Sequence, residues 1–102
     1  MELTEPTDFD VLAAFRDGRN VGANVALELG LEPASVTTRL SRLVEHGLLA
    51  RVGPSEQSGL YELTKRGEAA LVYRDHYTDL GRDRFEAVVS DAADPAPAAG
   101  AD

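Results

Sequence analysis

The sequence predicts a mainly α-helical α+β fold with one small β-hairpin, in the order α-α-α-β-β-α. Apolar residues recur at helical spacing in three early segments and again after residue 65. Two short runs, 48–52 and 60–63, have the pattern of strands, and the run 53–59 between them is rich in turn-forming residues. We therefore expect one domain over residues 1–89, followed by a disordered acidic Ala/Pro tail over residues 90–102.

The composition excludes several classes of site. The chain has 102 residues and no cysteine, so disulfides, thiolate metal sites and thiol catalysis are absent. It has no apolar run long enough to span a membrane, and its first residues lack the features of a signal peptide, so we expect a soluble cytoplasmic protein. With 18 acidic residues, 10 basic residues and a single lysine, its composition is typical of halophilic archaeal proteins. An ordinary acidic protein is the alternative.

The net charge of −8 is unevenly distributed. Residues 1–32 carry a net charge of −5, and residues 67–102 carry another −5. Residues 33–66 hold five bases and three acids, a net charge of +2. A surface that binds DNA is therefore expected within residues 33–66.

The first helix is expected to begin at Thr7, whose side chain would cap it together with Asp10, and to end at Asp17-Gly18. Residues 19–21 are expected to form a short link. A second helix is expected over residues 22–29, ended by Gly30.

The third helix is expected to begin at Pro33, because proline suits a first helical position. Val36, Leu40 and Leu43 share its apolar face, and Gly47 follows its end. After the hairpin, Thr64 is expected to cap a final helix that starts at Lys65. Gly81 interrupts that helix, and the sequence leaves open whether it is one bent helix or two.

Helices 22–29 and 33–46, joined by a tight turn, have the arrangement of a helix-turn-helix, in which the second helix lies in the major groove of DNA. Hydroxyl and guanidinium groups suit phosphates and base edges. The second helix carries five such side chains as candidate DNA contacts: Ser35, Thr37, Thr38, Arg39 and Arg42. Ordinary solvated helix residues are the alternative interpretation of this polar face.

Three motifs together resemble a known family. Residues 18–26 look like the opening of the helix-turn-helix of small archaeal winged-helix regulators, and residues 36–48 look like their recognition helix. Residues 59–67 are similar to their second wing strand and the Leu-Thr-x-x-Gly sequence that follows. The chain thus resembles the haloarchaeal phage-repressor-like winged helix-turn-helix family, within the wider class of MarR- and ArsR-type repressors, over about residues 8–72.

The resemblance implies a homodimeric transcriptional repressor that binds double-stranded DNA, with recognition helix 33–46 and wing 48–63. Its wing contacts would be Arg51, Gln57, Ser58 and Tyr61, and Lys65 and Arg66 would neutralise phosphates. Two positions depart from the family pattern. Gly22 stands where members often have proline, and Glu56 would repel phosphate at the wing tip.

The final helix carries apolar residues that would either close the core or form the dimer interface. We expect the dimer interface, with five residues as its candidates: Leu71, Tyr73, Tyr77, Leu80 and Phe85.

No catalytic constellation, phosphate-binding glycine loop or cofactor motif is present, so we expect neither an enzyme nor a cofactor. His46 and His76 are expected to be surface residues rather than metal ligands. The alternative function is a winged helix used as a protein–protein interaction module without DNA binding.

Overall fold

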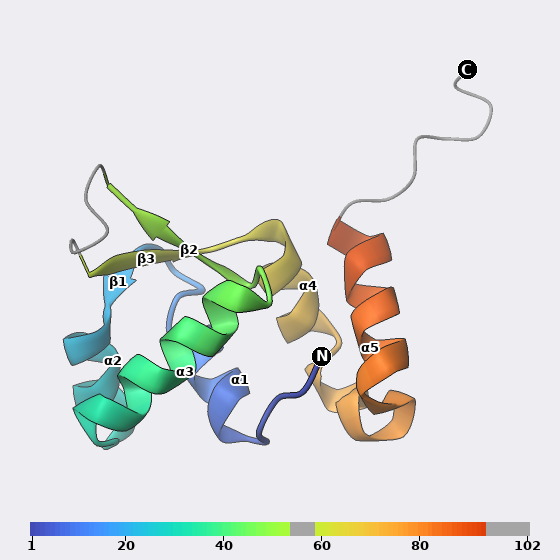
Figure 1. The fold of residues 1–102 in the computed structure, drawn as a ribbon, viewed down its shortest axis with the longest axis horizontal. Coiled ribbons are helices and arrows are strands. Elements are labelled where there is room, and N and C mark those ends of the chain that lie inside the picture. The colour runs from blue at the N-terminus through green and yellow to red at the C-terminus, as the bar shows by residue number, and fades with distance from the viewer. Residues whose placement is uncertain (54–58, 94–102) are drawn as a thin grey trace.

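The computed structural model describes residues 1–53 and 59–93, and it confirms an α+β chain with a small antiparallel sheet. The helices of this part are α1 (Thr7–Ala13), α2 (Gly22–Leu29), α3 (Pro33–Glu45), α4 (Lys65–Val72) and α5 (Tyr77–Ala93), with a 3-10 turn, η1 (Arg74–His76). The strands are β1 (Asn20–Val21), β2 (Leu49–Val52) and β3 (Leu60–Leu63). α3 crosses the front of the molecule beside α2 and the sheet, and α5 stands at the opposite end from α2 (Figure 1).

The predicted second and third helices are confirmed. α2 ends at Gly30, which adopts the left-handed conformation (φ 67°) that glycine accepts without strain. Pro33 is the first residue of α3, and Gly47 follows its end with φ 77°. The glycine and proline residues at the helix ends are therefore sufficient to place both helices.

The link expected at residues 19–21 is partly a strand. Asn20 and Val21 form β1, which pairs antiparallel with β3, so the sheet order is β1-β3-β2. Asn20 lies opposite Tyr61, and Arg51 of β2 lies opposite the same tyrosine from the other side. A two-residue strand has no periodicity of its own, and its pairing depends on residues forty positions away.

The start and end of α1 differ from the prediction. The helix has Pro6 as its N-cap, with no side-chain capping bond, and it ends at Ala13 rather than at Asp17. The backbone of Asp8 instead donates to the Thr4 carbonyl (2.8 Å), and the Asp10 side chain accepts from Arg74 (3.1 Å). The carboxylate of Asp10 thus binds a distant arginine, whereas the predicted capping box required it to bind the backbone at the start of the helix.

Aromatic rings of α1 and α5 pack together in the core. Phe9, Tyr77 and Phe85 pack edge to face, with ring centroids 4.9–5.9 Å apart. Phe9 and Phe85 are fully buried, as are Leu12 and Leu43. Within residues 1–53 and 59–93, the helices are all too short or too polar to cross a lipid bilayer.

The final segment is not one helix. α4 ends at Val72, η1 follows, and α5 itself kinks at Gly81, whose φ of 79° and ψ of 160° are not helical. α5 continues to Ala93, so the prediction of a tail from residue 90 is wrong for residues 90–93. These residues are ordered because Val89 is fully buried and Ser90 accepts a hydrogen bond from Arg66. The rest of the predicted tail lies outside the described residues.

Thr64 caps α4 as predicted, since its side-chain oxygen accepts a hydrogen bond from the Gly67 amide (2.9 Å). Gly67 is needed here for a different reason. A Cβ atom at this position would lie 2.2 Å from the Leu48 carbonyl oxygen and 2.6 Å from a Leu63 methyl group. The glycine therefore allows α4 to approach the backbone that connects α3 to β2.

Gly67→Ala should destabilise the fold by about 3 kcal/mol, because backbone and buried side chains must shift to admit the methyl group. The change in the free energy of unfolding can be measured by urea denaturation. Glu68→Ala, at the next and exposed position of α4, is the control and should change stability by less than about 0.5 kcal/mol. Equal stability of the two variants would contradict the close approach.

The N-terminal residues pack against α5. Met1 and Leu3 are buried, and the Tyr77 hydroxyl donates to the Met1 carbonyl (3.1 Å) and accepts from the Leu3 amide (2.9 Å). The N-terminal ammonium donates to the Glu86 carboxylate at 2.7 Å. This hydrogen bond and the positive charge of the ammonium hold the pKa of Glu86 below its ordinary value.

A carboxylate with a lowered pKa in the folded state stabilises the fold above its unfolded pKa, and the contribution is lost as pH falls through the folded pKa. The stability advantage of the wild type over Glu86→Gln should therefore shrink as pH is lowered from 6 to below about 4. Thermal melting across this range measures it. Asp83→Asn, which removes an exposed carboxylate of the same helix, is the control. An advantage that stays constant with pH would show that the ion pair contributes nothing.

Candidate nucleic-acid interface

The turn between α2 and α3 fixes how α3 is presented. Leu31 donates its amide to the Ala26 carbonyl (3.0 Å), which closes the end of α2, and Pro33 starts α3 two residues later. Val36, Leu40 and Leu43 are buried, as the sequence predicts. The opposite side of α3 consequently faces outward along its length.

The outward side of α3 is polar and uncharged over its first two turns. Thr37 and Thr38 are exposed, and their hydroxyls donate to the carbonyls of Pro33 (3.0 Å) and Ala34 (3.1 Å). Each hydroxyl oxygen keeps lone pairs for an outside donor, and each methyl group faces away from that bond. The first acidic residue of the helix is Glu45, at its last position.

Beside this face, the buried carboxylate of Asp8 binds two arginines. Its Oδ1 accepts from Nη1 of Arg39 (2.8 Å), and its Oδ2 accepts from Nη1 of Arg42 (3.2 Å) and from the Thr4 amide (2.8 Å). Asp8 is 0% exposed, whereas the side chains of Arg39 and Arg42 are 22% and 39% exposed. The cluster joins α1, α3 and the N-terminal segment.

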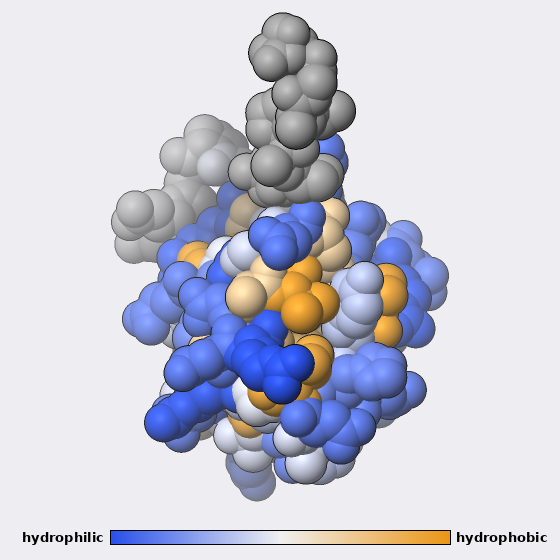
Figure 2. All heavy atoms as spheres, turned by 90° about the vertical axis from the view of Figure 1, so that its right-hand side faces the viewer, coloured by the Kyte–Doolittle hydropathy of each residue, from blue (hydrophilic) through white to orange (hydrophobic). Residues whose placement is uncertain are grey.

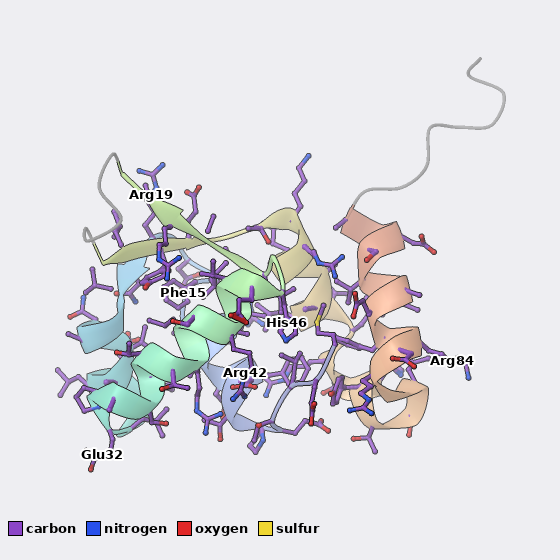
Figure 3. The ribbon with its side chains drawn as sticks, viewed as in Figure 1. Phe15, Arg19, Glu32, Arg42, His46 and Arg84 are labelled. Atoms are coloured by element: carbon purple, nitrogen blue, oxygen red, sulfur yellow. The ribbon has the colours of Figure 1, made fainter. Side chains whose placement is uncertain are left out.

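Asp8 thus changes the expected roles of Arg39 and Arg42. The sequence predicts both arginines as DNA contacts on the polar face of α3, with ordinary solvated residues as the alternative, but the structure pairs them with a carboxylate at the α1 side of α3. Arg39 also donates from Nε to Ser35 (3.3 Å), so Ser35 supports the arginine rather than facing outward by itself. Figure 3 shows Arg42 leaving α3 on the side of α1.

The predicted wing residues are only partly placed. Arg51 is exposed on β2, and its guanidinium lies 5.8 Å from the ring centroid of Tyr61. Tyr61 is half-buried and packs edge to face with Phe15 at 6.4 Å. Gln57 and Ser58 lie outside the described residues, as does Glu56.

Lys65 and Arg66, both predicted to neutralise phosphates, have different surroundings. Lys65 is exposed at the start of α4. Arg66 donates from Nε to the His46 carbonyl (2.9 Å) at the end of α3, and its other nitrogens contact Ser90 and Glu86. Arg66 therefore caps the C-terminus of α3, where a cation is favourable for the helix dipole.

The residues predicted for a dimer interface lie in the core of the single chain. Phe85 is 0% exposed, so a partner could not reach it, and the prediction is wrong for this residue. Leu71 is 7% exposed and lines a shallow hollow next to Val72. Tyr73, Tyr77 and Leu80 are partly buried and pack against the same core. The apolar pattern of the final segment is explained by its packing onto α1 and the N-terminal residues.

Most arginines of the described chain are paired with carboxylates. Besides the Asp8 cluster, ion pairs join Arg19 to Glu62, Arg66 to Glu86, Arg74 to Asp10 and Arg82 to Glu2. Within residues 1–53 and 59–93, four basic side chains have no carboxylate partner: Arg16, Arg51, Lys65 and Arg84. Arg84 points outward from α5, far from α3 (Figure 3).

Within the part of the chain that the structure describes, no group of three or more His, Asp or Glu side chains is arranged to hold a metal ion. Comparison with family models, with curated proteins and with solved structures finds no match to this chain.

Asp8 is the functional candidate that the sequence analysis did not identify. Its spacing carries a signal, because Val11, Leu12 and Phe15 follow it at i+3, i+4 and i+7 and are all buried. An acidic residue at a buried helical position needs a cationic partner. Arg39 precedes the buried Leu43 by four residues, which places it beside the apolar face rather than opposite to it.

Asp8→Ala should destabilise the fold by about 2 kcal/mol or more, because two partly buried guanidinium groups and the Thr4 amide lose their acceptor. The free energy of unfolding by urea measures the change. Asp10→Ala is the control on the same helix, since Asp10 also pairs with an arginine but its side chain is 47% exposed, and it should cost less than about 1 kcal/mol. A similar cost for both would mean that burial adds nothing to the Asp8 cluster.

Proposed function

We propose that this protein is a winged helix-turn-helix transcriptional regulator that binds double-stranded DNA, with α3 in the major groove and the β2–β3 hairpin as the wing. The observation that carries the proposal is the unobstructed outer side of α3. It bears Thr37 and Thr38, has no acid before Glu45, and lies beside the hairpin strand that carries Arg51. A major groove about 12 Å wide admits one such helix.

The two threonines carry groups that can make short-range contacts with the edges of DNA bases. Their hydroxyl oxygens can accept hydrogen bonds from base amino groups, and their methyl groups match thymine methyl groups. Arg39 and Arg42, which pair with Asp8 at the edge of this face, would contact the phosphates that border the groove. Arg51 and the exposed Lys65 are the candidates for phosphate contacts outside α3.

A repressor of this type would bind a two-fold DNA site as a dimer, and the dimer needs a surface other than the buried residues of the final segment. Val72 is 72% exposed on α4 and lies between two shallow hollows, one lined by Leu63 and Leu71 and the other by Ala92 and Ala93. Figure 2, which faces the side with α5, shows apolar atoms at its centre bordered by hydrophilic residues. We assign the dimer contact to the face around Val72.

A protein–protein interaction module is the second candidate, and α2 favours it. Leu27 is 83% exposed and Leu29 is 37% exposed, next to the exposed Glu28 and Glu32. Such a surface suits a partner with an apolar contact and a basic border. This module would have no affinity for DNA.

Thr38→Glu tests the proposal, because it places a carboxylate at the centre of the outer side of α3. It should weaken binding to a specific duplex by about tenfold or more through repulsion by phosphate. Binding is measured by fluorescence anisotropy and footprinting on the DNA upstream of the protein's own coding sequence, against a random duplex, in low and multimolar potassium chloride. The high-salt arm is included because the acidic composition predicts a salt-rich environment.

Ala87→Glu adds the same charge at an exposed position of α5 and is the matched control, which should bind as the wild type does. Circular dichroism of both variants establishes that they are folded. Binding of Thr38→Glu equal to that of the control would exclude α3 as the contact helix. Absence of wild-type binding in both salts, from folded protein, would favour the interaction module, and Leu27→Ser would then be tested for loss of a captured partner.

A further inference from the structure

We propose that Asp8 is the positioning residue of the DNA-binding face: it directs Arg39 and Arg42 and halves the charge that they present. This inference rests on the proposed function. Asp8, a residue of α1, would thereby set the ratio of specific to non-specific DNA binding.

The geometry restricts both arginines. Each carboxylate oxygen of Asp8 takes one guanidinium, and the Thr4 amide fixes the carboxylate by donating to Oδ2 at 2.8 Å. Arg39 is held at a second point, where its Nε donates to Ser35. A long side chain that is already held loses less conformational entropy when it binds an outside acceptor.

Arg42 keeps binding capacity after it is paired. Within the described residues it makes one hydrogen bond, from Nη1 at 3.2 Å, and its side chain is 39% exposed. A guanidinium has five N–H donors in a fixed planar fork, so the remaining donors are directed by the bond to Asp8. The carboxylate therefore sets which way the free edge of Arg42 points.

The same contact lowers the charge of the site. Two guanidinium groups and one carboxylate leave a net charge of +1 where the arginines alone would give +2. Non-specific affinity for DNA comes almost entirely from neutralised phosphates, so this reduction weakens non-specific binding more than it weakens directed contacts. Asp8 thus favours binding that depends on the sequence of the DNA.

Asp8→Asn tests this inference, because it keeps the shape of the side chain and one acceptor oxygen but removes the charge and one acceptor. Affinity for the specific site and for a random duplex is measured between 0.1 and 1 M potassium chloride. The affinity ratio of specific to random duplex should fall about fivefold or more. The slope of log affinity against log salt concentration should become steeper by about 0.9 for each additional phosphate contacted.

Asp10→Asn is the matched control, since it removes the same charge from the same helix but frees Arg74 instead of the α3 arginines. It should leave the affinity ratio and the salt slope at the wild-type values. If Asp8 only ties α1 to α3, folded Asp8→Asn protein will also bind with the wild-type ratio and slope, and the inference is overturned. Wild-type protein that does not distinguish the two duplexes would overturn the proposed function, and the inference with it.

A measurement on the wild type covers the case in which Asp8→Asn does not fold. Because Nη1 of each arginine donates to Asp8, the arginine Nη–H signals are recorded by NMR on 15N-labelled protein, free and bound to the specific duplex, and are assigned with Arg39→Lys and Arg42→Lys. Both signals should be protected from solvent exchange in the free protein and should shift when DNA is added. Signals that exchange freely before binding, or that do not move with DNA, would overturn the inference.

Discussion

The arrangement of this chain depends on one buried carboxylate. Moving an ionised carboxylate out of water costs several kcal/mol, and the cost is offset only if good donors surround it. Asp8 has three such donors from two other parts of the chain, two from α3 and one from the N-terminal segment. The rotation of α3 about its own axis is therefore tied to α1, since any other rotation would leave a buried charge without partners. The apolar face of α3 determines which side of the helix is buried, and the ion pairs with Asp8 add a specific contact between α3 and α1.

Close approaches of the backbone hold the rest of α3 in place. At the start of α2, a Cβ atom on Gly22 would lie 3.1 Å from a methyl group of Leu40, so the absence of a side chain lets α2 pack closely on α3. At the other end, Arg66 donates to the His46 carbonyl and Thr64 donates to the Gly47 carbonyl (2.6 Å), which binds the C-terminus of α3 to the start of α4. The helix proposed to contact DNA is thus supported along its side and at its C-terminal end, and a rigid element of this kind positions contacts more accurately than a loop does.

The sequence was sufficient where structure is decided locally. Gly30 places the end of α2, and Pro33 and Thr64 place the starts of α3 and α4, because each acts through the conformation or hydrogen bonding of its own few residues. It was insufficient where a partner lies far along the chain. β1 exists through its pairing with β3, and the roles of Arg39 and Arg42 depend on a carboxylate more than thirty positions earlier. The apolar spacing correctly predicted that the final segment is packed. Periodicity does not say whether the packing partner is the same chain or a second copy. In the structure, Phe85 packs against Phe9 of its own chain.

A net charge of −8 and a surface for DNA are compatible if affinity comes from short-range fit. Most arginines of the described chain are already paired with carboxylates, so little of their charge acts at long range. Above about 1 M salt the Debye length is about 3 Å, so the repulsion between the acidic surface and phosphate is screened together with any attraction. In the proposed complex, recognition under those conditions would depend on short-range hydrogen bonds and methyl contacts from Thr37 and Thr38. It would also depend on guanidinium groups whose orientation is fixed before DNA binds. The buried Asp8 would meet this requirement, because its ion pairs lower the positive charge of Arg39 and Arg42 and fix their geometry.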